Sequence, residues 1–415
     1  MRLIPTVAAL ALGLTLCTGQ GSYRGDEGRG SEPVRPGLEV LFTDSIHLVS
    51  GRRVGLITNH TALDTDGTHA VDLLAAFPEI ELAALFGPEH GIRGHAAAGA
   101  RVESARDSAT GLPVHSLYGE TRKPTSAMLE GLDVLVFDIQ DIGARYYTYV
   151  STMALAMEAA GEAEIPFVVL DRPNPIGGAL VQGSILDPAF ATFVGMYPVP
   201  MRHGMTVGEL ARLFVREFGA QVELHVVPVA GWRRSMWFDR TGLPWVPPSP
   251  NMPSLESATH YPGTCLFEGT NLSVGRGTNR AFQQIGAPWL DGEALAARLN
   301  AYELAGVRFE PVAFTPVRPS DEKFGGETVR GVRFVVTDRE RYDPTVAGVA
   351  ALLEARELAG DRWEWKPEHF DRLAGTDRLR NAIDAGRPPE EIVSGWAAER
   401  ESFIEMRSGV LLYPE

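Results

Sequence analysis

The chain has 415 residues, and at this length we expect two domains rather than one hydrophobic core. Its hydrophobic content of 44% with 8% aromatic residues is ordinary for a packed protein and excludes a mainly disordered chain. The formal net charge of −15 argues against a nucleic-acid or anionic-membrane surface, because such partners require a clustered excess of Lys and Arg.

Residues 1–20 have the composition of an export signal. Arg2 supplies a positive charge, and residues 7–16 supply a short apolar run. Residues 14–17 partly resemble a lipoprotein cleavage box in which Cys17 would be acylated, so secretion and lipid anchoring both stay open. Residues 21–37 are polar and Gly-rich, which predicts a flexible tether. We therefore expect an exported protein that is periplasmic, secreted or anchored at the cell envelope.

Beyond the tether, short apolar runs alternate with amphipathic stretches, a pattern that predicts an α/β fold with a parallel sheet covered by helices. The expected strands are residues 53–58, 82–86, 134–138 and 167–171. Between them, residues 69–77 and 148–161 carry apolar residues at helical spacing.

The second half of the chain is less regular. Residues 201–218 predict a loop that enters a helix, with Thr206 and Glu209 spaced as a capping box. Residues 232–262 are rich in Pro and Trp without a regular period, and we interpret them as a long functional loop. From residue 291 to residue 414, helical patterns surround one strong strand at residues 331–337, which predicts a smaller α+β domain.

Carboxylates mark the expected strand ends, where ligands of open parallel sheets bind. They are Glu89, Asp138, Asp141 and Asp171. Glycosidic cleavage usually employs a carboxylic acid and a second carboxylate, although a single carboxylate at a strand end is often only a cap or a turn former. Glu89 is the best general-acid candidate, because Glu is a poor capping residue and Pro88 and Gly91 bracket it in a loop that needs a specific backbone path.

Aromatic and arginine side chains follow the third expected strand, at Arg145, Tyr146, Tyr147 and Tyr149. Aromatic faces stack on sugar rings, and Arg binds carboxylates with two parallel hydrogen bonds. This group therefore predicts one wall of a sugar-binding site. A tyrosine-rich helix start packed into the core is the alternative. Residues 249–256 and 267–278 form further polar clusters, and in the second we interpret Glu268, Asn271 and Arg276 as hydrogen-bonding groups held by glycines.

Other chemistries fit the sequence less well. Residues 267–278 lack the order of a phosphate-binding loop, and the chain has no G-x-S-x-G serine elbow. A zinc site could be built from His60, His90 and His203, but the chain has no short metal-ligand pair, so we expect neither a metal nor another cofactor. Cys265 is interpreted as a small core residue rather than a nucleophile.

Taken together, these runs resemble the exo-β-N-acetylmuramidases, a family first described as a domain of unknown function, over about residues 37–413. The matching motifs are GLITNH (55–60), FGPEHG (86–91), FDIQDIGARYYTY (137–149), DRPNP (171–175), RHGMT (202–206), SPNMP (249–253) and EGTNLSVGRGT (268–278). The resemblance implies a Rossmann-like catalytic domain that binds no dinucleotide, over residues 38–230, and an auxiliary α+β domain over residues 231–415 that contributes loops to the cleft.

The implied activity is exo-acting release of terminal N-acetylmuramic acid from the non-reducing end of peptidoglycan fragments. Glu89 would protonate the glycosidic oxygen, while Asp138, Asp141 or the substrate's own N-acetyl group would supply the second catalytic function. The anionic lactyl group of the sugar would be received by Arg145 or Arg172, with Arg202 or Arg276 as the next candidates.

The full set of expected substrate-binding residues is Asn59, His90, Arg145, Tyr146, Tyr147, Arg172, Asn174, Arg202, His203, Asn251, Glu268, Asn271 and Arg276. Two alternatives stay open. One is a non-catalytic lipoprotein that captures cell-wall fragments with the same aromatic and arginine wall, and the other is a metal-dependent hydrolase.

Overall fold

A mostly parallel β-sheet organises the first half of the chain in the computed structural model, which describes Met1 and residues 33–94 and 104–415. Its strands, in spatial order, are β3 (Ala105–Arg106), β4 (Pro113–Ser116), β2 (Glu81–Gly87), β1 (Arg53–Thr58), β5 (Val134–Asp138), β6 (Phe167–Leu170) and β9 (Leu224–Val227). All four expected strands are confirmed. β3 is antiparallel to β4, and the other neighbours pair in parallel.

Helices cover both faces of this sheet, which is why its central strands read as continuous apolar runs. Along β5, Val134 and Val136 face a core that includes Leu38 of α1 (Gly37–Asp44) and Leu74 of α2 (Ala70–Ala76). The alternating residues of β5 belong to a second core, together with residues of α4 (Tyr149–Glu162) and α5 (Val207–Phe218). The expected capping box of α5 is confirmed.

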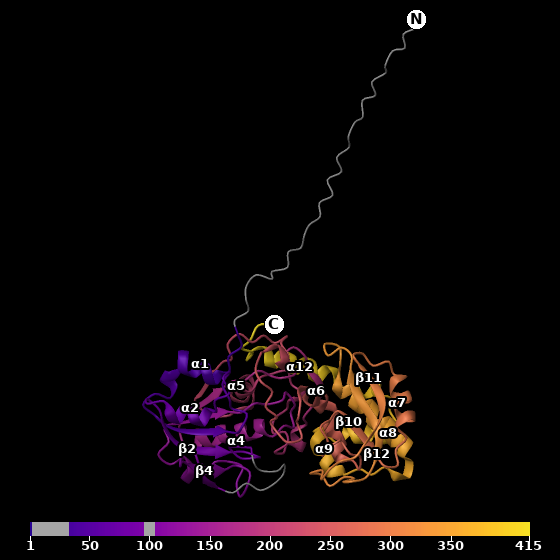
Figure 1. Cartoon of the computed structure of the whole chain (residues 1–415), viewed down its shortest axis with the longest axis horizontal. Coiled ribbons are helices and arrows are strands. Elements are labelled where there is room, and N and C mark those ends of the chain that lie inside the picture. Colours follow the sequence, from indigo (N-terminus) through magenta and orange to yellow (C-terminus); the bar gives the residue numbers. More distant parts are fainter. Residues whose placement is uncertain (2–32, 95–103) are drawn as a thin grey trace. The chain divides into compact units, whose positions relative to one another are not determined.

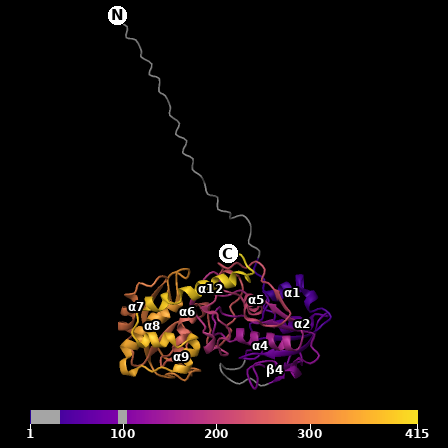
Figure 2. The same cartoon turned by 180° about the vertical axis from the view of Figure 1, so that it is seen from behind.

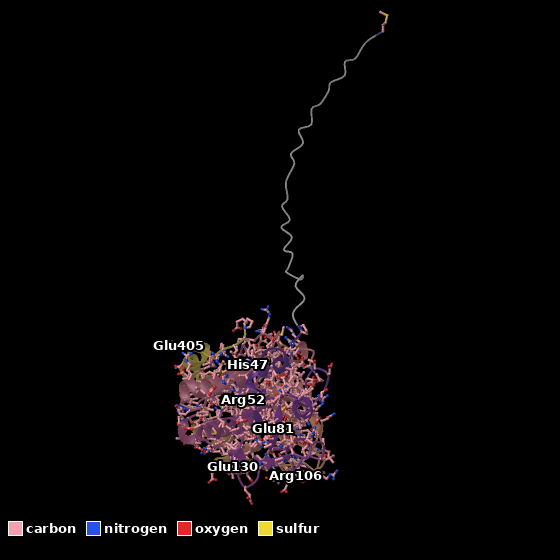
Figure 3. The ribbon with its side chains drawn as sticks, turned by 90° about the vertical axis from the view of Figure 1, so that its left-hand side faces the viewer. His47, Arg52, Glu81, Arg106, Glu130 and Glu405 are labelled. Atoms are coloured by element: carbon pink, nitrogen blue, oxygen red, sulfur yellow. The ribbon has the colours of Figure 1, made fainter. Side chains whose placement is uncertain are left out.

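The carboxyl ends of β1, β2, β5 and β6 meet at one edge of the sheet, because the strands are parallel and in register, with Thr58 opposite Asp138. The amino ends of β1 and β2 lie at the opposite edge, where Arg52 and Glu81 are labelled in Figure 3. The arrangement of the strands therefore brings the residues that follow them to one place.

The second half contains an antiparallel sheet in which β12 (Val329–Val336) lies between β10 (Gln284–Ala287) and β11 (Val307–Phe314). The strand expected at residues 331–337 is confirmed as β12, whereas β10 and β11 were not predicted. β10 is short, and β11 alternates between buried and exposed residues, so neither produces a continuous apolar run. The mixed α/β fold class is confirmed, whereas the division at residue 230 stays a prediction.

The helices of this half are α6 (Leu255–Thr264), α7 (Gly292–Asn300), α8 (Pro344–Ala359), α9 (Pro367–Ala374), α10 (Arg378–Asp384), α11 (Pro389–Ser394) and α12 (Ala397–Ser408). Figures 1 and 2 show α7 and α8 beside each other, and Figure 1 shows them near the strands of the antiparallel sheet. Residues 232–262, expected to be irregular, contain a short 3-10 helix (Phe238–Arg240) and most of α6, which Ser254 caps.

The remaining elements are short. α3 (Ser126–Leu129) precedes β5, and β7 (Gln182–Ile185) pairs with β8 (Pro200–Arg202), where a loop was expected at residue 201. Further 3-10 helices cover Ile46–Leu48, Pro188–Phe190, Cys265–Gly269 and Gly360–Arg362.

The C-terminal tail returns to the parallel sheet, where the Tyr413 hydroxyl donates to the buried Asp171 carboxylate. Across the ranges that the structure describes, no helix combines the length and apolar character needed to cross a membrane. The expected export signal, Cys17 and most of the tether fall outside those ranges.

Candidate active site

A pocket opens at the edge of the parallel sheet where the strands end, with about 480 Å³ of space including its mouth. We call it the Glu89 pocket. Its described lining consists of Glu89, His90, Tyr146, Tyr147, Thr148, Tyr149, Ser249, Asn251, Met252, Tyr261, Arg276 and Phe282. Six of these residues belong to the set expected from the sequence, namely Glu89, His90, Tyr146, Tyr147, Asn251 and Arg276.

Glu89 reaches the pocket because the chain turns sharply after β2. Gly91 donates its backbone N–H to the Pro88 carbonyl at 2.9 Å, and His90 and Gly91 have φ angles of 72° and 71°. A non-glycine residue at such an angle is strained, so the surrounding structure must hold the turn in place. The side chain of Glu89 stays partly exposed while its neighbours Pro88 and His90 are buried.

The tyrosines form an edge-to-face cluster behind Glu89. The Tyr147 ring lies 5.1 Å from that of Tyr149 and 5.9 Å from that of Tyr261. The Tyr149 hydroxyl donates to the Pro248 carbonyl at 2.7 Å, and Tyr146 donates to the Pro262 carbonyl, so these two also anchor the core. The Tyr147 hydroxyl is buried without a hydrogen-bond partner, which leaves it available to a ligand in the pocket.

Asp141 lies close enough to Tyr147 and Tyr149 for its charge to affect their pKa values, although it is not part of the described lining of the Glu89 pocket. One carboxylate oxygen, Oδ2, accepts the Gly143 N–H at 2.7 Å and lies 3.6 Å from His203 Nε2, whereas Oδ1 is buried without a partner. His203 Nδ1 accepts the Met205 N–H, so the ring proton of a neutral His203 is on Nε2, facing Asp141. Burial, with the charges of Glu89 and Asp141 adding to it, raises the pKa values of Tyr147 and Tyr149.

Asp138, expected as a catalytic candidate, is paired with Arg172 instead of facing the pocket, and its catalytic role stays a prediction. Its side chain is fully buried, and its two oxygens accept from Nε and NH2 of Arg172 at 2.5 and 2.9 Å. The third nitrogen of Arg172 donates to the Leu63 carbonyl at 3.0 Å. Both residues therefore have structural partners, and neither belongs to the described lining of the Glu89 pocket.

The guanidinium groups of Arg145 and Arg202 also bind other parts of the protein. Arg145 donates to the carbonyls of Ser184, Val199 and Leu373 at 2.8–3.1 Å. Arg202 donates to the Gln182 side chain and the Ile176 carbonyl, and its guanidinium packs 5.2 Å from the Trp237 ring centre. Burial lowers the pKa of each to about 10. Neither belongs to the described lining of the Glu89 pocket, because both bind other segments of the chain, and their expected contact with the sugar stays a prediction.

Three of the asparagines expected to bind substrate form hydrogen bonds within the protein. Asn174 accepts from Ile176 N–H and donates to the Met205 carbonyl, and Asn271 bonds the backbone of Arg362 and Glu364. Asn59 accepts from the Thr61 backbone and hydroxyl, but its Nδ2 is buried without a partner. Of the three, Asn59 therefore keeps a donor for a ligand or a water molecule.

Arg276 is the arginine that the described part of the chain presents to the pocket. Its guanidinium forms an ion pair with Glu268, donates through NH1 to Ser320 Oγ at 3.1 Å and packs 5.3 Å from the Phe282 ring centre. Ser320 also accepts from Asn251 Nδ2 at 3.2 Å. Glu268 therefore positions the Arg276 side chain, and Ser320 forms hydrogen bonds with two pocket residues, Arg276 and Asn251.

Sequence reasoning missed several members of this site. Tyr261 and Phe282 gave no signal beyond their aromatic character, and Ser320 lies in the loop between β11 and β12. Lys323 anchors that loop by donating to the carbonyls of Phe267 and Leu272 at 3.2 and 2.7 Å. The loop was not predicted to approach the pocket, because β11 itself was not predicted.

The structure also bears on the thiol and on the histidines considered for a zinc site. Cys265 is 1% exposed and contacts Glu268, as expected of a core residue. His60 bonds the Pro247 carbonyl. Within residues 33–94 and 104–415, no three His, Cys, Asp or Glu side chains are arranged to hold a metal ion.

Comparison with known proteins adds independent information. Residues 54–256 match the family model for the exo-β-N-acetylmuramidase NamZ N-terminal domain, and residues 259–413 match the model for the C-terminal domain. The peptidoglycan β-N-acetylmuramidase NamZ of Bacillus subtilis (strain 168) is 46% identical over 381 residues, covering 92% of this chain and 91% of the relative.

Two solved structures from Bacteroides fragilis NCTC 9343, both of DUF1343 family proteins, share the fold. The first has a TM-score of 0.86 and 37% identity, covering 92% of this chain and 99% of its own. The second has a TM-score of 0.76 and 32% identity, covering 92% and 100%.

Proposed function

The chain belongs to the exo-β-N-acetylmuramidase family NamZ, and we propose that it removes terminal N-acetylmuramic acid from peptidoglycan fragments in the Glu89 pocket. It is an exo-acting glycoside hydrolase, as the motifs of the sequence implied. The observation that carries the choice of site is the position of Glu89, which stands partly exposed in a pocket walled by tyrosines and one arginine.

Glu89 serves as the general acid. Cleavage of a glycosidic bond requires a proton on the leaving oxygen, and a carboxylic acid beside the bond supplies it. Glu89 lines the pocket and is partly exposed, so a sugar bound there could present its glycosidic bond to this carboxylic acid.

Asp141 serves as the second carboxylate. With Asp138 paired to Arg172, Asp141 is the remaining candidate of the original pair, and its Oδ1 is a buried acceptor without a partner. A buried acceptor of this kind favours a donor from a bound ligand or water. That donor is either the attacking water or the acetamido N–H of the substrate.

Arg276 receives the lactyl carboxylate. The sugar carries a negative charge into an acidic protein, so a local cation must compensate it, and a guanidinium can bind a carboxylate with two parallel hydrogen bonds. Glu268 and Ser320 hold the Arg276 side chain from two directions and so reduce the entropy lost when the ligand binds.

The direct test is hydrolysis of a chromogenic β-N-acetylmuramide by the full chain, with and without chelator, followed by the same assay on the matched N-acetylglucosaminide. We expect turnover of the muramide that is insensitive to chelator and roughly a hundredfold or more preference for it, because the glucosaminide leaves Arg276 without its ligand. Binding without turnover would support the capture lipoprotein instead. Loss of turnover with chelator would support the metal-dependent hydrolase.

We further propose that residues 1–20 direct export and that Cys17 is the site of lipid attachment. The apolar run and the position of Cys17 support this. Expression with a radiolabelled fatty acid tests it: the label should enter the wild-type chain and not a Cys17→Ala variant. A mature wild-type chain that carries no label would instead indicate simple secretion.

A further inference from the structure

A second aromatic group lies at the same edge of the sheet as Glu89. The rings of Tyr118 and Phe193 are 6.4 Å apart and tilted by 48°. The guanidinium of Arg122 lies 4.2 Å from the Phe193 ring centre and 5.7 Å from that of Tyr118. The two rings are half-buried and Arg122 is exposed, and none of the three belongs to the described lining of the Glu89 pocket. We call this group the Tyr118–Phe193 platform.

The strand register places the platform next to Glu89. β4 pairs in parallel with β2, so that Ser116 lies opposite Gly87, and the N–H of Leu117 donates to the Gly87 carbonyl at 2.8 Å. Glu89 follows Gly87 by two residues, and Tyr118 follows Ser116 by two residues. Burial and, after it, the negative charge of Glu89 raise the pKa of Tyr118, in agreement with this proximity.

The platform also approaches the pocket through the chain around Phe193. Gly195, two residues beyond Phe193, packs against the side chain of Arg145, and Arg145 lies 5.6 Å from the ring centre of Tyr146, which lines the pocket. The segment after β4 therefore brings Tyr118 to the region of Glu89, and the segment before β8 adds Phe193 to the same platform.

A general acid stands beside the oxygen that joins two sugars. If the terminal sugar fills the Glu89 pocket, the next sugar must lie beside Glu89 but outside the pocket. We propose that Tyr118, Phe193 and Arg122 form the leaving-group subsite, which binds the pyranose ring on the far side of the bond that is cleaved. This inference rests on the role proposed above for Glu89.

The chemistry of the platform suits that position. A pyranose ring presents a face of C–H groups that packs on aromatic rings, and guanidinium N–H groups donate to hydroxyl and acetamido oxygens. The partial exposure of the platform fits as well, because the rest of a glycan chain must continue from this sugar into solvent. The terminal sugar has no such continuation and can occupy the more enclosed tyrosine pocket.

The test compares two substrates of the full-length enzyme. The disaccharide of N-acetylmuramic acid β-1,4-linked to N-acetylglucosamine places a sugar on the platform, whereas methyl β-N-acetylmuramide places only a methyl group there. In a Tyr118→Ala/Phe193→Ala double variant we expect kcat/KM on the disaccharide to fall roughly tenfold or more through a raised KM, because two ring contacts are lost. Turnover of the methyl glycoside and inhibition by free N-acetylmuramic acid should stay within about twofold of wild type.

Three further variants separate binding from folding. Phe77→Ala removes a half-buried ring, 5.2 Å from Phe42, that precedes the amino end of β2, and it should affect neither substrate preferentially. A Tyr118→Phe/Phe193→Tyr variant keeps both rings and should keep the preference for the disaccharide. Arg122→Ala, at an exposed position where folding is not at risk, should selectively weaken use of the disaccharide.

The outcomes also separate this inference from the proposed function. Equal losses on both substrates, or no loss on either, in the double variant and in Arg122→Ala would overturn the subsite. If Glu89→Gln is inactive in that case, the proposed role of Glu89 stands and only the subsite is wrong. If Glu89→Gln instead turns over like wild type, the proposed function fails first and the subsite fails with it.

Discussion

Arg172 binds Asp138 with two parallel hydrogen bonds of 2.5 and 2.9 Å, and both side chains are at most 5% exposed. The pair joins the end of β5 to the segment that follows β6. The pair gives one expected catalytic carboxylate and one expected lactyl-binding arginine a structural partner, because each satisfies the other. The charged residues at this edge of the sheet thus divide into those that hold strand ends together and those that face the pocket.

Replacing Arg172 by Lys should destabilise the fold and reduce activity on all substrates alike. Lys keeps the charge but cannot make the two-pronged contact, and a poorly compensated buried carboxylate costs on the order of 3 kcal/mol. Denaturant unfolding measures the loss, and the ratio of kcat/KM for a muramide and its lactyl-free analogue should match that of wild type. A selective loss on the muramide would return Arg172 to the binding site.

Glu89→Gln should lower turnover by about two to four orders of magnitude, because the amide keeps the shape of the side chain but carries no acidic proton. The measurement is kcat on the disaccharide, together with a melting curve that should match wild type. Glu130→Gln is the matched control, since Glu130 is an exposed carboxylate on the surface in Figure 3 and should leave turnover unchanged. Activity of Glu89→Gln within tenfold of wild type would exclude Glu89 as the acid.

Sequence reasoning located the parallel sheet because its strands are buried on both faces. β1 and β5 each contain an apolar run that closes on a polar residue, and their ends were predicted correctly. β11 was not predicted because its residues alternate between buried and exposed. The loop between β11 and β12 was therefore not predicted either. The prediction failed for β10, which is fully buried but only four residues long, and for β11, which has one solvent-facing side.

The same reasoning brought candidate residues to one edge of the sheet but could not predict the direction of each side chain. Topology alone brought Glu89 and Tyr147 to one edge of the sheet. Whether Arg145 faces the pocket or the backbone carbonyls around Leu373 depends on packing against residues more than two hundred positions away in the chain. Arg276 comes from the second half of the chain, where no parallel strands were predicted whose ends could locate a binding site.

Arg276→Lys should raise KM for muramides more than for N-acetylglucosaminides. The ammonium keeps a positive charge but loses the fork that would bind the lactyl carboxylate, Glu268 and Ser320 together. The KM values for the two matched chromogenic glycosides measure this, with Arg341→Lys as a control at an exposed position. Equal changes on both glycosides would mean that another group recognises the lactyl carboxylate.

Stability should fall in mild acid through His260, which lies on α6, fully buried against Phe334 and hydrogen-bonded through Nδ1 to the Tyr342 hydroxyl at 2.9 Å. Burial lowers the pKa of His260 to about 3. The unfolded chain takes up a proton at this residue near pH 6.5, whereas folded His260 stays neutral until the pH approaches 3. The contribution of neutral His260 to the free energy of unfolding is therefore complete above pH 6.5 and is lost as the pH falls toward 3.

This loss should amount to about 2 kcal/mol at pH 5, because each pH unit between the two pKa values corresponds to about 1.4 kcal/mol. Urea unfolding at pH 7.5 and pH 5 measures it in wild type and in His260→Asn, which retains a polar group near the Tyr342 hydroxyl but does not titrate. Cavity formation will lower the stability of the variant at both pH values, so the informative quantity is the difference between them. That difference should shrink by about 2 kcal/mol in the variant. An unchanged difference would show that folded His260 takes up its proton as readily as the unfolded chain does, and acid sensitivity would then have to come from other residues.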